Sequence, residues 1–288
     1  MNMKTSWKFG TTLTLAGFLL LSVFLPVDAA ARHRRPRPAK LHYHHDRASG
    51  RVVLTWTGRA TLECSAGSSG RFEPLPSARS PFVIEPTATP MQFRMAGGVY
   101  SVNIVGYVNT SLPPGLSVIT NPLLNTTNTV SHLFPAAPDG TQVYRLDGTN
   151  YTVSTFDAIA GAWSNPGLEL LPGDGFFVRN PSAATFVNTF VGEVLLGTLI
   201  NPLPAGYSLQ ADMVPQGGSI NSIHEIPGQS GDRIYKFAPD ADGREAWIES
   251  AFDPDQNLWL PDLYIGVGEG FMVYKQAPQD WVRIFLPF

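Results

Sequence analysis

Three acidic residues around one glycine are the first candidates for chemistry in this chain. Asp240, Asp242 and Glu245 flank Gly243, and carboxylates at alternate positions before a glycine suit a hard cation such as Ca²⁺. The stretch lacks the further acid and the terminal Glu of an EF-hand loop. An internal repeat of the chain keeps only Asp147-Gly148 at the matching place. A hairpin turn therefore explains what the two stretches share, with calcium as the alternative; we expect no other cofactor.

Two further acids invite a catalytic interpretation. Asp174 and Glu269 each lie between two glycines, and glycoside hydrolysis uses a pair of carboxylates. They occupy matching places in two copies of one module, however, and a residue present in both copies serves the fold rather than a single active site. His132 and His224 also match, but the chain has no G-x-S-x-G nucleophile turn. We interpret both histidines as loop or short-helix residues and expect a protein that is not an enzyme.

Aromatic residues in hairpins and loops are the strongest candidates for binding. A flat ring on a β surface can stack on the face of a sugar, and the five candidates are Trp163, Trp247, Trp259, Tyr151 and Tyr264. The alternative is core filling, because aromatic residues favour strands and Trp163 and Trp259 recur in both copies. Clustering on one exposed face would favour an extracellular polysaccharide as partner, whereas burial would remove the basis for sugar contact.

The elements that position these residues come from a module written twice after about residue 100. Each copy has a Pro-x-Gly turn that feeds an apolar strand, then a hairpin, then a Gly-acid-Gly turn before another apolar strand. We expect positive φ at glycines of both turns. The matched stretches are 112–117 with 203–208, 143–146 with 234–237, 151–157 with 246–253, and 171–178 with 266–273.

The boundary between the copies follows from a further match. Val105-Gly106 resembles Val191-Gly192, and we read each pair as the opening strand of its copy. The first copy is therefore assigned to residues 100–188 and the second to residues 189–288.

The motif order resembles a duplicated β-repeat of exported proteins from Verrucomicrobia and Planctomycetes. Its outline is a "GWNLIS"-like strand, a "YxxxG.Y" hairpin and a "pGxGYwV" strand, which correspond here to 115–119, 144–151 and 172–178. Leu116 stands where that repeat usually has Trp. The resemblance implies a secreted or surface role. We expect a structural or adhesive protein of the cell envelope or extracellular space, with envelope proteins or polysaccharide as partners. It brings no characterised activity.

Residues 48–97 read as a smaller module of short strands. Strands are predicted at 51–56, 61–64, 82–84 and 92–95, separated by glycine and proline. The run resembles the fibronectin type III-like modules that precede such repeats, with Val52-Val-Leu-Thr-Trp56 as the "VxLTW" strand and Phe72 in place of a more usual Trp. The resemblance implies a β-sandwich, so we expect an all-β protein of three modules.

The first 47 residues carry targeting features. Lys4 and Lys8 precede an apolar stretch that ends before Ala29-Ala-Ala31, a pattern typical of a cleaved signal peptide over residues 1–31. Residues 32–47 are rich in Arg, His and Pro and are predicted to form a basic linker. Such a linker can be a plain spacer, an electrostatic tether to an anionic polysaccharide, or a weak metal ligand through His42, His44 and His45.

Composition narrows the classes of function. The hydrophobic fraction is 43%, the charged fraction only 15%, and Gly 27 and Pro 25 are spread along the chain, which is typical of many short strands and turns. A net charge of −3 gives no electrostatic reason to expect nucleic acid. Cys64 is the single cysteine, so the fold must be stabilised by packing rather than by intrachain disulfides. No membrane span is expected after signal cleavage.

Overall fold

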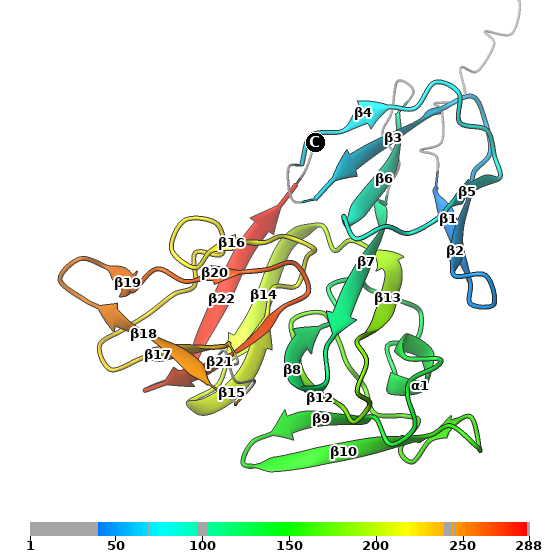
Figure 1. Cartoon of the computed structure of the whole chain (residues 1–288). Helices are drawn as coiled ribbons and strands as arrows, with labels where there is room; N and C mark the ends of the chain where they lie inside the picture. Colours follow the sequence, from blue (N-terminus) through cyan, green and yellow to red (C-terminus); the bar gives the residue numbers. More distant parts are fainter. Residues whose placement is uncertain (1–39, 68–69, 97–102, 239–243, 245, 287–288) are drawn as a thin grey trace, which may run out of the picture. The chain divides into compact units, whose positions relative to one another are not determined.

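Antiparallel strands make up almost all of the regular structure, which confirms the all-β fold class (Figure 1). The computed structural model describes residues 40–67, 70–96, 103–238, 244 and 246–286, which all belong to one unit of the chain. The predicted signal peptide, residues 32–39 of the predicted linker, and Asp240, Asp242 and Glu245 lie outside these described residues.

The N-terminal module contains every strand predicted for it. Its strands are β1 (His42–Asp46), β2 (Arg51–Thr55), β3 (Thr61–Ala66), β4 (Glu73–Pro74), β5 (Phe82–Ile84) and β6 (Met91–Ala96). One sheet has the order β1-β2-β5, and the other runs β4-β3-β6 before it continues into the first repeat copy. A core that includes Leu54, Leu62 and Met95 fills the space between the sheets.

The prediction of a linker over residues 32–47 is wrong for its last part. Residues His42–Asp46 form β1, which pairs along its whole length with β2, and Leu41 immediately before it is fully buried. The pattern was obscured because His42 and His44 face solvent while Tyr43 between them packs on the core. A polar edge strand with only one apolar face lacks the hydrophobic run that marks a central strand.

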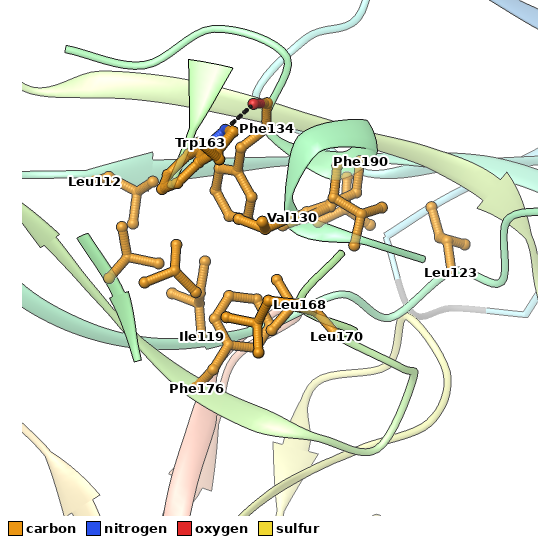
Figure 2. Packing of buried hydrophobic residues seen from close by; sticks show 14 of the residues in the cluster. Leu112, Ile119, Leu123, Val130, Phe134, Trp163, Leu168, Leu170, Phe176 and Phe190 are labelled. Atoms are coloured by element: carbon orange, nitrogen blue, oxygen red, sulfur yellow. Dashed lines mark hydrogen bonds between the residues drawn. The ribbon is translucent and has the colours of Figure 1, made fainter. Parts of the chain in front are cut away.

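The first repeat copy contains one short helix and seven strands. They are β7 (Val105–Leu112), β8 (Gly115–Thr120), α1 (Val130–Leu133), β9 (Gln142–Asp147), β10 (Asn150–Asp157), β11 (Ala162–Trp163), β12 (Gly175–Asn180) and β13 (Phe186–Glu193). Five of them form a sheet in the order β11-β10-β9-β12-β8. Figure 2 shows the core under this sheet, where Phe134, Phe176 and Phe190 meet edge to face.

The second repeat copy has the same strand order. Its strands are β14 (Gly197–Leu203), β15 (Gly206–Ala211), β16 (Gly218–Ser219), β17 (Arg233–Phe237), β18 (Trp247–Asp253), β19 (Leu258–Leu260), β20 (Tyr264–Ile265), β21 (Gly270–Lys275) and β22 (Gln279–Phe285). The five-stranded sheet runs β19-β18-β17-β21-β15, which is the order of the first copy strand for strand. Positive φ at Gly115, Gly148, Gly173, Gly206 and Gly268 confirms five of the predicted turn glycines. The predicted turn at Asp242-Gly243 lies outside the described residues.

Strand pairing moves the boundary between the copies. Val191-Gly192 lies in β13, which pairs antiparallel with β7 so that Gly192 faces Gly106. The two Val-Gly pairs are therefore cross-strand neighbours in one copy rather than equivalent residues. The equivalent of Gly106 is Gly197 in β14, nine residues before the glycine of the Pro-x-Gly turn in each copy. Pairing thus places the start of the second copy after Glu193 rather than at residue 189.

Candidate functional site

The Gly-acid-Gly turns join the two copies to each other. The N–H of Thr120 donates to the carbonyl of Gly268 at 3.0 Å, and the N–H of Ala211 donates to the carbonyl of Gly173 at 2.9 Å. Thr120 and Ala211 end the equivalent strands β8 and β15. The two hydrogen bonds are therefore equivalent, one running from the first copy to the second and the other from the second to the first. Each turn therefore binds the strand of the other copy.

The acids in these turns stabilise the turns themselves. Asp174 accepts a hydrogen bond from the N–H of Leu171 at 3.1 Å, and Glu269 accepts one from the N–H of Gly266 at 2.7 Å. Each also has a cationic neighbour on the hairpin strand, Arg145 at 3.8 Å from Asp174 and Lys236 at 3.1 Å from Glu269. Burial raises the pKa of Asp174. Both copies thus have an acid that caps the turn and a cation beside it, and we assign Asp174 and Glu269 a structural role in these turns.

Two of the five candidate aromatics are buried and cannot stack on a ligand. The Nε1–H of Trp163 donates to the carbonyl of Phe134 at 2.8 Å (Figure 2), and the Nε1–H of Trp259 donates to the carbonyl of Ile226 at 2.7 Å. Both rings lie in hydrophobic cores. Their prediction as sugar contacts is corrected by this burial. A tryptophan fits such a core because its single polar group finds a backbone acceptor.

Two other candidates come together across the junction of the copies. Tyr151 lies in β10 and Trp247 in β18, each three residues before the serine that pairs with the hairpin partner strand, Ser154 with Val143 and Ser250 with Ile234. The two residues are therefore equivalent in the repeat. Both rings contact Phe177, with centroid distances of 6.0 Å for Tyr151 and 6.2 Å for Trp247. Tyr151 is 48% exposed and Trp247 is 36% exposed. We call these three residues the aromatic row; it presents two partly exposed rings braced by a buried one.

The apolar layer between the two sheets positions the aromatic row. Phe177 packs in a cluster with Val118 of the first copy and with Leu209 and Phe237 of the second, and Trp247 rests on Phe237 at 5.0 Å between centroids. Tyr264, the remaining candidate, is exposed on β20. No ring contact between Tyr264 and the aromatic row is found in the described residues, so the five predicted aromatics do not form one surface.

The sequence prediction missed a second aromatic group. Tyr207, Tyr235 and Tyr274 lie on β15, β17 and β21 of one sheet. The ring centroid of Tyr207 is 6.2 Å from that of Tyr235 and 4.8 Å from that of Tyr274. Burial and a hydrogen bond with Tyr207 raise the pKa of Tyr235 to about 12. The register pairs Tyr207 with Tyr274 directly. Only knowledge of that register could have found the group, because its members are far apart in sequence.

A cleft of about 980 Å³ opens beside the N-terminal strand β1. It is lined by β1, by the segment that contains α1 and by β13, and the lining includes His42, His44, His45 and His132. Burial and the neighbouring Arg47 lower the pKa of both His45 and His132. Burial and the charge of Glu193 raise the pKa of Tyr43, on the same strand, to about 12.

The histidines of β1 do not converge on a metal site. Successive side chains of a strand point to opposite faces, which separates His44 from His45. In the described part of the chain no group of three His, Cys, Asp or Glu side chains is placed to hold a metal ion. The calcium hypothesis concerns Asp240, Asp242 and Glu245, which lie outside the described residues.

The described fold and site define an all-β protein with a duplicated sheet module. Comparisons of the chain with protein-family models, with curated proteins and with solved structures found no match. Among the described residues, no helix has the length and apolar character needed to span a bilayer.

Proposed function

We propose that this protein is an exported, non-catalytic structural or adhesive component of the cell envelope or of the extracellular space. The observation that carries this proposal is how the modules are joined. Strand β7 pairs with β6 of the N-terminal module and with β13 of the first copy, and the two copies exchange backbone hydrogen bonds through Gly173 and Gly268. The repeated motifs are thereby used to build and join modules, which is what a structural protein requires of its sequence.

Export is proposed from the N-terminal sequence, with its basic residues, apolar stretch and small residues near Ala31. The experiment is fractionation of the producing cells, followed by N-terminal sequencing of the recovered protein. We expect the protein in the envelope or the medium, with a new N-terminus close to residue 32. Recovery from the cytosol with Met1 in place would overturn the proposal.

We also propose that the N-terminal module is fibronectin type III-like. The supporting observation is the division of its strands, with β1-β2-β5 in one sheet and β4-β3-β6 in the other, which β7 and β13 of the first copy continue. Antiparallel strands in two packed sheets are the framework of such sandwiches. The relationship to exported verrucomicrobial and planctomycete repeat proteins is a proposal that rests on the motif outline alone.

A second candidate function is the binding of extracellular polysaccharide. The aromatic row favours it, because Tyr151 and Trp247 are partly exposed and both contact Phe177, and sugars stack on such rings. The test is a glycan array followed by affinity electrophoresis in gels that contain the polysaccharide. We expect Tyr151→Ala and Trp247→Ala each to weaken retardation at least tenfold.

The matched control is Tyr264→Ala, an exposed tyrosine outside the aromatic row. It should leave retardation unchanged. Equal retardation of all three variants and the wild type would show that the aromatic row is not the binding surface, and absence of retardation by any glycan would leave only the structural proposal.

A further inference from the structure

One two-stranded ribbon occurs in both repeat copies. In the first copy it is made of β7 and β13, and in the second copy of β14 and β22. The pairs are equivalent because β7 and β14 each end in a leucine before the Pro-x-Gly turn, and β13 and β22 each follow the strand after the Gly-acid-Gly turn. One face of each ribbon packs on its own copy, so the opposite face can be compared between copies.

In the first copy this outward face is covered by the N-terminal module. Tyr107 and Val191 are a cross-strand pair on it, and they are only 2% and 4% exposed. They pack in one cluster with Leu41, Val52 and Leu54, which belong to or adjoin the sheet β1-β2-β5. The edge of β7 is also covered, since β6 pairs with it. A second β layer therefore covers this end of the first ribbon, whereas Val187, further along the same face, is exposed.

In the second copy the residues of the equivalent face are exposed. Thr198 pairs with Ile284 and Ile200 pairs with Val282 on it. Ile200 and Val282 are each 52% exposed, and Ile284 is 73% exposed. Among the described strands the sheet contains only β14 and β22, and Figure 1 shows them side by side as a yellow-green and a red arrow. We call this face of Thr198, Ile200, Val282 and Ile284 the open ribbon face.

Solvent exposure alone would favour polar residues on the exposed face and apolar residues on the covered face, but the middle pair of each ribbon shows the opposite. At the position of the Ile200–Val282 pair the first copy has Asn109 and Thr189, which are joined by a 2.7 Å hydrogen bond. Asn109 also donates to the carbonyl of Thr87 in the N-terminal module. The polar pair thus lies beside the covering module, and the aliphatic pair lies in water. Contiguous exposed apolar surface of this kind marks an interaction site.

We propose that the open ribbon face packs on the same face of a second copy of this chain. In the first copy the covering element is a β layer, and the open ribbon is itself a β layer that carries matching aliphatic pairs. Sheets pack face to face at about 10 Å with their apolar side chains interleaved. A two-fold axis lets one patch serve both subunits, which is the commonest arrangement of soluble homo-oligomers.

The chemistry of the open ribbon face excludes two other modes of contact. Among the paired residues on this side of the described ribbon, the charged one is Asp280, at the end opposite Pro202, so the face offers little to a highly charged partner. Pro202 lacks the N–H that a further strand along β14 would need, which disfavours extension of the sheet at this edge. The remaining mode of contact is face-to-face packing, which requires a partner surface that is also apolar and flat.

Sedimentation equilibrium over a range of concentrations tests this proposal on the protein in its naturally processed form. The main variant, Ile200→Asn with Val282→Thr, introduces the polar pair that the same fold already holds in the first copy. We expect a monomer–dimer equilibrium for the wild type and an association constant at least tenfold weaker for the variant. Val187→Thr, at an exposed position of β13 in the first copy, is the matched control and should dimerise as the wild type does.

Two results would overturn the proposal. The first is a wild type that stays monomeric up to about 100 μM, because such a protein does not self-associate specifically. The second is a dimer that survives the double substitution, because that dimer uses another surface. Far-UV circular dichroism and the urea midpoint check that the variant is folded. If it is not, Ile284→Thr alone replaces it, because that side chain is the most exposed of the face and its substitution leaves the ribbon interior untouched. Self-association is independent of where the protein resides and of whether it binds sugar.

Discussion

The N–H of Thr120 and the carbonyl of Gly268 are 3.0 Å apart and join the first repeat copy to the second. The reverse contact, from Ala211 to Gly173, repeats this geometry at 2.9 Å. The strands following these turns come so close to the other copy that a side chain has no room. A Cβ at Gly175 would stand 2.7 Å from the carbonyl oxygen of Gln210, and one at Gly270 would stand 2.9 Å from that of Ile119.

The second glycine of each Gly-acid-Gly turn is therefore predicted to be sensitive to the smallest substitution. Gly175→Ala and Gly270→Ala should each lower the free energy of unfolding by about 1–3 kcal/mol, because the obstacle is backbone that cannot rotate away. Urea unfolding followed by circular dichroism measures the loss. Gly167→Ala is the control, since a Cβ there meets nothing within 4 Å; it should be neutral or stabilise by up to about 1 kcal/mol. Equal effects at the three positions would contradict the close approach of the copies.

The buried tryptophans are predicted to matter through their ring nitrogens. Trp163→Phe and Trp259→Phe keep most of the apolar volume but leave the buried carbonyls of Phe134 and Ile226 without their donors. Each should cost about 1–3 kcal/mol in the free energy of unfolding. Trp247→Phe, at a half-exposed ring with no such bond in the described residues, should cost less than either. Similar losses for all three variants would argue that the indole hydrogen bonds contribute little.

One ion pair lies wholly inside the second copy. Lys275 and Asp232 are both buried and in contact, and Lys275 also donates to the carbonyl of Pro227 at 3.0 Å and to Gln279 at 2.7 Å. Lys275→Met leaves the Asp232 carboxylate without its cation and should cost about 3–5 kcal/mol. Adding Asp232→Asn should recover part of that loss, because no uncompensated charge then remains.

The comparison for this pair is Arg51→Met, which removes the partner of Glu85 at the surface. Exposed ion pairs contribute about 0–1 kcal/mol, so thermal unfolding of that variant should be close to the wild type. A loss at Lys275 as small as the loss at Arg51 would mean that the buried pair does not stabilise the fold.

The cleft beside β1 is predicted to make stability depend on pH. Burial, with the nearby Arg47 and His44, lowers the pKa of His45, and the smaller opposing effect of Asp46 does not cancel this. Burial and Arg47 also lower the pKa of His132. The folded protein therefore binds fewer protons than the unfolded chain between the lowered pKa and the ordinary value of about 6.5. Stability contributed by these neutral histidines is present above that value and is lost as the pH falls through the folded pKa.

Urea midpoints at about pH 7.5 and about pH 5 test this dependence. The wild-type midpoint should fall on acidification by more than the midpoint of His45→Gln, which cannot take up the proton. His42→Gln, an exposed position on the same strand, should behave as the wild type does. A His45→Gln variant with an undiminished pH dependence would assign the effect to other groups.

Much of the local structure was predictable because its causes are local. A glycine with positive φ and a proline with fixed φ select turns within a few residues, and the turns at Gly115, Gly148 and Gly173 appear where the residue types predicted them. The short N-terminal strands and the hairpin of β9 and β10 follow in the same way from alternation and turn chemistry. The all-β class needs nothing more than these signals.

The candidate site was predictable only in part. Each of the five aromatics was found by type, but their environments differ. Trp163 and Trp259 are core residues, while Tyr151 and Trp247 are partly exposed and both contact Phe177. The sequence contains no local signal that separates these roles, since all lie in similar stretches of strand and turn. Which face of a strand is buried depends on what the rest of the chain places against it.

The amino-acid sequence by itself determined that this protein is built of short strands, where its turns fall and that its sheet module is duplicated, because φ preferences, alternation and repetition act along the chain. Only the tertiary structure decided that His42–Asp46 is a strand, that β7 belongs to two modules, and that Gly173 and Gly268 bind the opposite copy. It also decided that Tyr107 is covered while Ile200 and Ile284 are bare. Strand pairing and the burial of a face depend on contacts between segments far apart in sequence, and the type of a residue does not determine which segment packs beside it.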